Sequence, residues 1–211
     1  MGRESGCQSP LWLDIVAPAK CALCDARGNP LCDFCFEELA PRWHQEGDLW
    51  YLGAYDGRWP ELIGRWKFGG QRLAPRHLVW SLPLPPLLPG ACLVPAPQSR
   101  WRFAARGYNQ AALLAQWLSE VSGAPVVDLL REPWRRTQTH LAADREARQN
   151  ARRITVRRPD RLANRPVYIV DDVLTTGQTL QCLRQALERS GIKVVGTIVL
   201  SRSLLHYPAT K

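Results

Sequence analysis

The clearest hydrophobic pattern in the chain is an unbroken apolar run from Val167 to Val170, which leads into two adjacent acids, Asp171 and Asp172. Four consecutive β-prone apolar residues indicate a buried parallel strand. After a polar turn, apolar residues recur at helical spacing and a glycine is placed to end the helix. These residues are Leu180, Leu183, Ala186, Leu187 and the terminating Gly191. A strand, a turn and a helix are therefore expected in succession around the acid pair.

The same patterns predict further elements on both sides of this unit. Strands are expected at 50–55, 91–94 and 192–200, where apolar and β-branched residues dominate. Short helices are expected at 36–43 and at 59–68, the second with Pro60 in its first turn. Asn109 is a suitable N-cap for another helix, whose shared apolar face would consist of Leu114, Trp117, Leu118 and Val121. Alternating strands and helices favour an α/β fold.

Length and composition fit this interpretation. A chain of 211 residues suits one α/β domain with a small appendage, and a hydrophobic content of 45% supports a true core. The stretch from Leu78 to Pro97 is uncharged and long enough to span a membrane, but its six prolines exclude a spanning helix. No secretory signal is visible after the opening MGRESG. The expectation is a cytoplasmic protein without a membrane span.

Positive charge is concentrated in one part of the chain. The formal net charge is +9, and the segment Arg131–Arg165 holds eleven arginines against four acids. Such a segment is expected to bind phosphate groups, either those of a substrate or those of nucleic acid. A solvated basic face is the alternative.

The acid pair and the turn after it predict a binding site for a ribose phosphate. Backbone N–H groups at a helix N-terminus attract a phosphate, and the threonine hydroxyls add donors. The residues expected to cradle the phosphate are Thr175, Thr176, Gly177, Gln178 and Thr179. The two carboxylates would repel a phosphate, but they suit the vicinal hydroxyls of a ribose. An ordinary strand-to-helix turn with surface acids is the alternative.

Seven cysteines occur in the chain, and four of them have the spacing of a metal site. Cys21, Cys24, Cys32 and Cys35 form two C-x2-C pairs separated by a short spacer. Four thiolates can enclose one tetrahedral zinc ion in a structural site without an open position. Cys92 and Cys182 lie in apolar patterns typical of core residues, and Cys7 has no partner spacing.

Three arginines follow the strand expected at 91–94, namely Arg100, Arg102 and Arg106. Ligands of α/β folds bind at the carboxyl ends of the strands. These side chains are therefore placed to neutralise a pyrophosphate, with solvated surface arginines as the alternative.

Two levels of family resemblance follow from these motifs. The apolar run, the acid pair and the threonine-rich turn resemble the motif with which type I phosphoribosyltransferases bind 5-phosphoribosyl 1-pyrophosphate (PRPP). The four cysteines, YDGRWPELIGRWKFGG, VPAP with RGYNQ, and the PRPP motif occur in an order that resembles the ComF family of competence-associated, phosphoribosyltransferase-like proteins. The resemblance extends from about Cys21 to Arg202.

The resemblance implies a fold and a set of roles. The fold is a doubly wound α/β domain with a mostly parallel sheet at 46–211, and residues 1–45 form a small zinc module with an N-terminal tail. Asp171 and Asp172 would hold the ribose hydroxyls, the loop from Thr175 to Thr179 would hold the 5′-phosphate, and magnesium would accompany PRPP. Residues 137–153 occupy the place of a hood that closes over PRPP, with either Arg145 or Arg148 in the family role.

Several functions remain open at this point. A transferase would displace pyrophosphate at ribose C1, with Arg102 and Arg106 stabilising the leaving group. A single-stranded-DNA-binding module of the DNA-uptake machinery would use the basic segment, and a helicase or recombination proteins would be its partners. A PRPP sensor without catalysis is a third hypothesis. Nothing in the sequence selects the acceptor or a general base.

Overall fold

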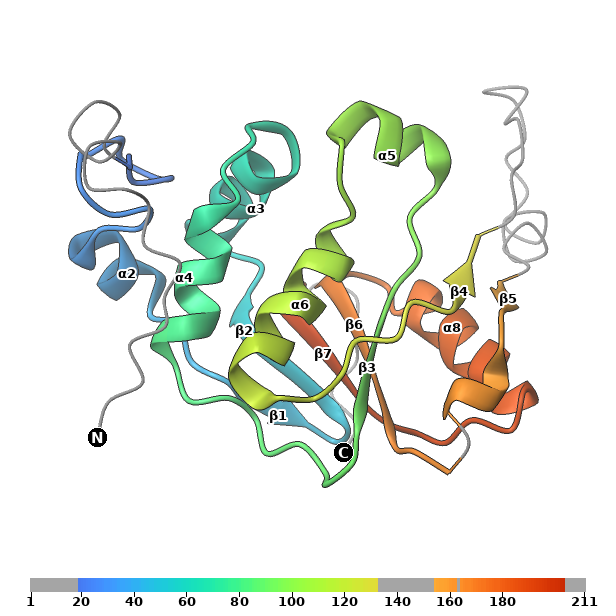
Figure 1. The fold of residues 1–211 in the computed structure, drawn as a ribbon. Helices are drawn as coiled ribbons and strands as arrows, with labels where there is room; N and C mark the ends of the chain where they lie inside the picture. Colours follow the sequence, from blue (N-terminus) through green and yellow to red (C-terminus); the bar gives the residue numbers. More distant parts are fainter. Residues whose placement is uncertain (1–18, 133–153, 163, 204–211) are drawn as a thin grey trace.

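A five-stranded, mostly parallel sheet organises the computed structural model, which describes residues 19–132, 154–162 and 164–203 (Figure 1). The strands lie in the order β1-β2-β7-β6-β3, and only β1 and β2 pair in antiparallel fashion. The strands are β1 (His44–Glu46), β2 (Leu49–Ala54), β3 (Cys92–Pro95), β6 (Val167–Leu174) and β7 (Val194–Arg202). The expected α/β fold with a mostly parallel sheet is confirmed.

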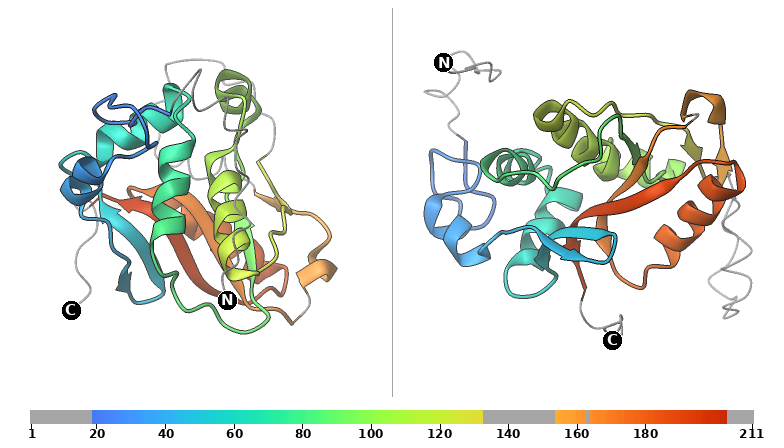
Figure 2. Two further views of the ribbon diagram at one scale, coloured as in Figure 1. Left: turned by 60° about the vertical axis from the view of Figure 1, so that its left-hand side comes forward. Right: turned by 90° about the horizontal axis from the view of Figure 1, so that it is seen from below.

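Helices cover both faces of the sheet, as the views from two directions show (Figure 2). Alternate residues of β6 face opposite sides: Tyr168 and Val170 pack with Leu114 of α6, whereas Val167 and Ile169 pack with Leu183 of α8. The helices are α3 (Trp59–Phe68), α4 (Leu73–Ser81), α6 (Gln110–Ser122) and α8 (Gln178–Arg189). Because β6 is apolar on both faces, it can occupy the interior of this doubly wound arrangement.

The connection from β3 to α6 contains a helix that the sequence patterns did not predict, α5 (Arg100–Arg106). Its arginines and alanines carry no apolar stripe strong enough to indicate a buried face. The start of α6 is as expected, since the Asn109 side chain accepts hydrogen bonds from the N–H groups of Ala111 and Ala112. The predicted burial of Val121 is wrong, because this residue lies in the final turn and is 47% exposed.

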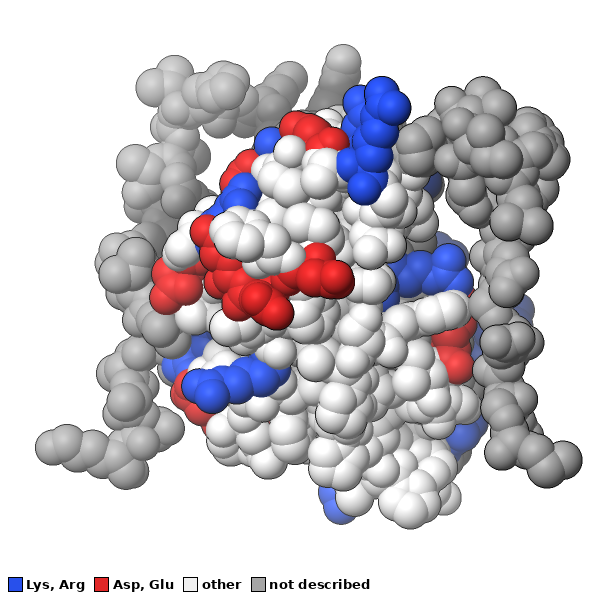
Figure 3. Space-filling view, turned by 90° about the vertical axis from the view of Figure 1, so that its left-hand side faces the viewer, with Lys and Arg blue, Asp and Glu red and all other residues white. Residues whose placement is uncertain are grey.

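The N-terminal residues pack onto the same core as the sheet. Helix α2 (Asp33–Leu39) begins and ends earlier than the expected 36–43. It ends at Leu39 because Ala40 adopts a left-handed conformation (φ 43°) directly before Pro41. Leu31 and Leu39 share a hydrophobic cluster with Trp66. Acidic side chains gather on the face that carries α2 and α3 (Figure 3). The exposed acids of these two helices are Asp33, Glu37, Glu38 and Glu61. A boundary near residue 45 remains our proposal.

The remaining short elements lie beside α8 at one edge of the fold (Figure 1). They are β4 (Leu130–Arg131), β5 (Thr155–Val156) and the 3-10 helix η1 (Pro159–Leu162). The predicted hood, 137–153, and the C-terminal tail after 203 lie outside the described residues. Among the helices that are described, none is long and apolar enough to cross a membrane.

Candidate functional site

The acid pair lies inside β6 and not in the turn after it. The sequence pattern placed the end of the strand at Val170, but pairing with β7 continues through Leu174 and matches Asp171 with Val199. Because successive side chains of a strand point to opposite faces, the two carboxylates leave the strand in different directions. Asp172 points to the side of α3, where its Oδ2 atom lies 2.7 Å from the Nζ atom of Lys67. The strand thus holds both acids rigidly at its carboxyl end.

The electrostatics of the acid pair are unfavourable for full ionisation. Burial, followed by the neighbouring charge of Asp172, raises the pKa of Asp171 to about 7. Two interactions oppose this shift: the Asp171 carboxylate accepts a hydrogen bond from the Asp172 N–H at 2.8 Å, and the Lys67 ammonium lies nearby. A second carboxylate–backbone bond joins Asp172 to the N–H of Val173 at 2.7 Å. Asp171 therefore changes charge close to neutral pH.

The threonine loop, residues 175–179, joins β6 to α8 as expected. Thr175 and Thr176 are exposed, and Gly177 occupies the N-cap position with a left-handed φ of 74°. No side chain caps this helix, so the N–H groups of its first turn are not used by an N-cap side chain. Gln178 and Thr179 form the first turn of α8. The loop has the geometry of an anion site at a helix N-terminus.

A pocket of about 240 Å³ lies between the end of α3 and helix α5, and basic side chains dominate its lining. The predicted Arg102 and Arg106 both line it, together with Lys67 and Arg72. The Arg72 guanidinium lies 4.0 Å from the ring centroid of Tyr108, and that of Arg106 lies 4.9 Å from the ring centroid of Phe68. Within the described part of the chain, the three arginines form no ion pair with an acid. We call this the arginine pocket.

The RGYNQ motif at 106–110 builds one wall of the arginine pocket. The Gln110 Oε1 atom accepts hydrogen bonds from Arg106 at 3.2 Å and from Gln98 at 3.3 Å. Asn109 both caps α6 and donates to the carbonyl of Ala96 at 2.9 Å, which ties the helix to the end of β3. The hydroxyl of Tyr108 donates to the carbonyl of Trp66 and so joins the connection between α5 and α6 to α3. The motif therefore fixes the direction of Arg106.

Polar atoms without partners mark the carboxyl end of β3. The Gln98 Oε1, Ser99 Oγ and Gln110 Nε2 atoms are buried and have no hydrogen-bond partner among the described residues. Leaving buried polar groups unpaired is costly unless another molecule satisfies them. This edge of the sheet is consequently suited to a polar ligand.

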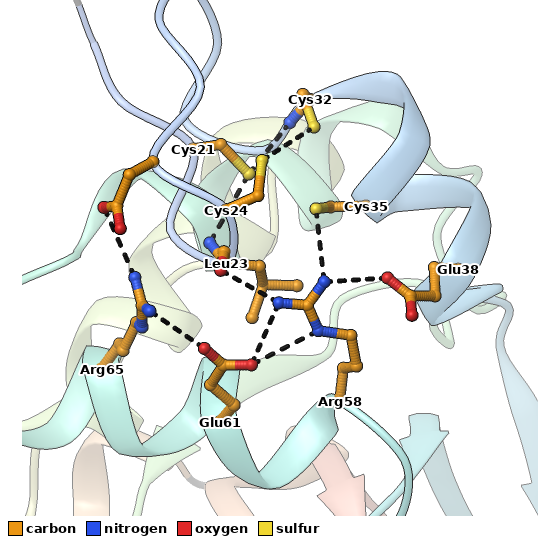
Figure 4. Close-up of polar contacts among 10 residues, drawn as sticks. Cys21, Leu23, Cys24, Cys32, Cys35, Glu38, Arg58, Glu61 and Arg65 are labelled. Atoms are coloured by element: carbon orange, nitrogen blue, oxygen red, sulfur yellow. Dashed lines mark hydrogen bonds and ion pairs between the residues drawn. The ribbon is translucent and has the colours of Figure 1, made fainter.

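The four predicted cysteine ligands meet in the N-terminal module (Figure 4). The sulfur atoms of Cys21, Cys24, Cys32 and Cys35 all lie within 4.8 Å of one another, and those of Cys24 and Cys32 lie 3.6 Å apart. Tetrahedral zinc with Zn–S bonds of about 2.3 Å places its sulfurs about 3.8 Å apart. Burial alone would raise the pKa of Cys21, but N–H groups of Cys32, Leu23 and Cys24 lower it to about 6. This cluster is compatible with zinc.

Arg58 ties the cysteine cluster to the α/β domain (Figure 4). It precedes α3, and its guanidinium donates to Glu38 of α2 at 2.8 Å, to the carbonyl of Leu23 at 2.9 Å and to the sulfur of Cys35 at 3.7 Å. Glu61 of α3 accepts from the same group. One side chain thus contacts the cysteine loop, α2 and α3 together.

Two residues of the site were not assigned a role from the sequence. Lys67 was noted only as part of the motif YDGRWPELIGRWKFGG, and Arg72 was not singled out. Their places depend on α3 and α5 meeting above the sheet, a long-range contact that no local pattern indicates. Arg100 was expected beside Arg102, but its side chain is outside the described set.

Comparison with known proteins gives one family and one curated relative. The family described as "Phosphoribosyl transferase domain" matches residues 104–204. The relative is competence protein F of Haemophilus influenzae, which is 28% identical over 219 residues, with 90% of this chain and 93% of that protein covered.

Solved structures of adenine phosphoribosyltransferases are also similar to the chain. The enzyme from Thermoanaerobacter pseudethanolicus is 18% identical, with 79% of this chain and 87% of that chain covered and a TM-score of 0.41. The enzyme from Trypanosoma brucei, solved with AMP, pyrophosphate and ribose-5-phosphate, is 14% identical, with 77% and 86% covered and a TM-score of 0.43. Residues 104–204 of the chain are thus similar to the phosphoribosyl transferase domain family, and the chain over most of its length is similar to competence protein F.

Proposed function

We propose that this protein binds PRPP across the carboxyl ends of β3 and β6. The observation that carries the proposal is the meeting of the acid pair and the arginine pocket through Lys67, which lines the pocket and contacts Asp172. Ribose hydroxyls suit carboxylates, and pyrophosphate suits unpaired arginines. A ligand that carries both groups on one sugar would use both halves of the site.

Each part of PRPP has a place in this arrangement. The threonine loop receives the 5′-phosphate at the N-terminus of α8, where the helix dipole favours an anion. Asp171 and Asp172 accept hydrogen bonds from the ribose hydroxyls. Arg102 and Arg106, supported by Arg72, neutralise the pyrophosphate, and the unpartnered polar atoms near Gln98 become satisfied by the ligand.

The reaction that suits this site is transfer of the phosphoribosyl group. A nucleophile would form a bond to ribose C1 while the bond from C1 to the pyrophosphate oxygen breaks, and the electron pair would leave with the pyrophosphate. The pocket arginines stabilise this developing negative charge. Magnesium prefers carboxylate and phosphate oxygens, so Asp171 and Asp172 are fitting ligands beside PRPP, and the ion would supply further neutralisation of the leaving group.

The four-cysteine cluster is proposed to hold one structural zinc ion. Four thiolates fill a tetrahedral coordination shell, which leaves no position for a catalytic water. Reduced cysteines of this kind are typical of the cytoplasm, where we place the protein.

Binding of single-stranded DNA is the second candidate function, and the name of the curated relative, a competence protein, favours it. Arg157, Arg158 and Arg161 are exposed in the described part of the basic segment. Helicase or recombination proteins of DNA uptake would then be partners. A PRPP sensor that binds without transfer is the third candidate, distinguished by binding of PRPP without pyrophosphate release for any acceptor.

Calorimetry with PRPP and magnesium tests the proposed function. The Asp171→Asn/Asp172→Asn double variant keeps the shape of the site but loses two charge-assisted hydrogen-bond acceptors, so PRPP affinity should fall at least about 100-fold. Asp160→Asn, an exposed acid of η1, is the control and should bind like the wild type. Unchanged affinity in the double variant would contradict the assignment of the ribose site.

A further inference from the structure

Lys67 lies at the junction of the two halves of the site. It belongs to the last turn of α3, lines the arginine pocket and reaches Asp172 with its ammonium group at 2.7 Å. The side chains of this pair are only 20% and 17% exposed, so solvent screens the interaction weakly. A lysine has a flexible four-carbon stem, which lets the charged end change partners without movement of the helix.

The charges around Lys67 explain why it pairs with Asp172 in the ligand-free protein. On one side, Arg72, Arg102 and Arg106 line the same pocket without an acidic partner among the described residues, and they repel the ammonium. On the other side, the acid pair attracts it, and its charge opposes the rise in the pKa of Asp171. An anion in the arginine pocket would replace the repulsion of the Lys67 ammonium by attraction and would draw Lys67 away from the acids.

We propose that Lys67 exchanges Asp172 for the pyrophosphate of PRPP and thereby selects ribose phosphates that carry a pyrophosphate over those that do not. This inference deepens the proposed function and rests on it. When PRPP binds, the Lys67 ammonium forms an ion pair with its pyrophosphate. Asp172 then becomes available to accept hydrogen bonds from the ribose hydroxyls. Ribose 5-phosphate offers no replacement partner in the pocket, so it must break the Lys67–Asp172 pair without compensation.

The exchange predicts opposite effects of one substitution on two ligands. Lys67→Gln removes a cation that contacts pyrophosphate, which should weaken PRPP binding with magnesium by about 10- to 100-fold. The same substitution frees Asp172 in the ligand-free protein, so ribose 5-phosphate should bind about twofold tighter or more. A residue with a merely structural role would weaken both ligands together.

Calorimetric titrations of both ligands into the full chain test this exchange. A buffer of about pH 8.5 keeps Asp171 ionised, since it lies above the pKa of about 7 that burial and Asp172 impose on this carboxyl. Lys67→Arg keeps the charge and should restore most of the preference for PRPP. Lys193→Gln, an exposed lysine before the start of β7, is the matched control and should leave both affinities unchanged.

The outcomes separate this inference from the proposed function. Weaker PRPP binding together with tighter ribose 5-phosphate binding in Lys67→Gln supports the exchange. Equal changes for the two ligands, or no change for either, overturn the role of Lys67 while the PRPP site stands. If the wild-type protein binds neither ligand, the proposed function is wrong and the exchange is wrong with it.

Discussion

At the scale of single residues, Asp171 combines a proposed role in ligand binding with an energetic cost. Its carboxyl sits in a rigid strand, where burial and the adjacent Asp172 favour the protonated form and raise its pKa to about 7. An unfolded chain would return this carboxyl to its ordinary pKa of 3.8. Between these two values the folded protein binds more protons than the unfolded chain, so this group lowers stability as the pH rises. The cost is fully present above about pH 7.

Replacing this carboxyl should therefore stabilise the protein above about pH 7, where the carboxyl is ionised in the fold. Asp171→Asn cannot ionise, and we expect it to exceed the wild type in unfolding free energy by about 1–2 kcal/mol at about pH 8, a value discounted for partial solvent exposure. Near pH 4 the difference should vanish, because the wild-type carboxyl is then protonated in the fold. Denaturant unfolding of both proteins across this range measures the effect. A difference that is constant with pH would show that Asp171 is not a source of electrostatic strain.

The sequence placed the candidate site residues along the chain but did not show how they contact one another. The acid pair, the threonine loop, Arg102 and Arg106 could be proposed because each follows an apolar run that indicates a strand, and α/β folds bind ligands at strand ends. The place of Lys67 could not, because the residue that it contacts is fixed by the packing of α3 over the sheet. Likewise, only the strand pairing with β7 reveals that Asp171 and Asp172 are strand residues.

At the scale of elements, strongly patterned segments were predicted best. Helix α8 and strand β6 have apolar positions at clear spacing, and Asn109 is a local signal for the start of α6. Helix α5 was missed because its charged surface faces the pocket and not the core. The end of α2 was misplaced because Ala40, a good helix former, adopts a left-handed conformation there.

The four-cysteine module should depend on both its metal and its contact with α3. Purified protein is expected to contain close to one zinc ion per chain, and Cys21→Ser/Cys24→Ser should lose it, as metal analysis would show. Arg58→Met should lower the unfolding free energy by about 1–3 kcal/mol, because the partly buried Leu23 carbonyl and Cys35 sulfur, and the more exposed Glu38, lose their donor. Arg65→Met, which breaks more exposed pairs with Asp25 and Glu61, is the control and should cost about 1 kcal/mol or less. Full zinc content in the double cysteine variant would contradict the ligand set.

At the scale of the whole molecule, charge is divided between distant surfaces. Acidic side chains gather on the face that carries α2 and α3, with basic side chains around them (Figure 3), although the chain as a whole has a formal net charge of +9. A nucleic acid would be repelled by these acids and attracted to the exposed arginines between β5 and β6, namely Arg157, Arg158 and Arg161. The four-cysteine module is thus a poor candidate for the DNA-binding surface, and the arginines between β5 and β6 are better ones.

A salt titration of single-stranded DNA binding tests this division of charge. Each phosphate contact on a single strand contributes about 0.7 to the slope of log affinity against log salt concentration. Changing Arg157, Arg158 and Arg161 to Gln should therefore reduce the slope by about 2 if all three contact phosphates. Arg65→Gln on the acidic face should leave both the slope and the affinity unchanged, because DNA does not approach that surface.

Addition of PRPP with magnesium to the same titration decides whether DNA and PRPP share a site. If the basic segment binds DNA at a site separate from the PRPP site, PRPP should leave DNA affinity unchanged. The variant with Arg157, Arg158 and Arg161 changed to Gln should then still bind PRPP like the wild type. If DNA phosphates instead occupy the arginine pocket, PRPP should displace DNA, and Arg102→Gln/Arg106→Gln should weaken both ligands. Absence of DNA binding by the wild type even at low salt would remove the nucleic-acid function. The pocket arginines, which form no ion pair among the described residues, would then be assigned to the proposed pyrophosphate site alone.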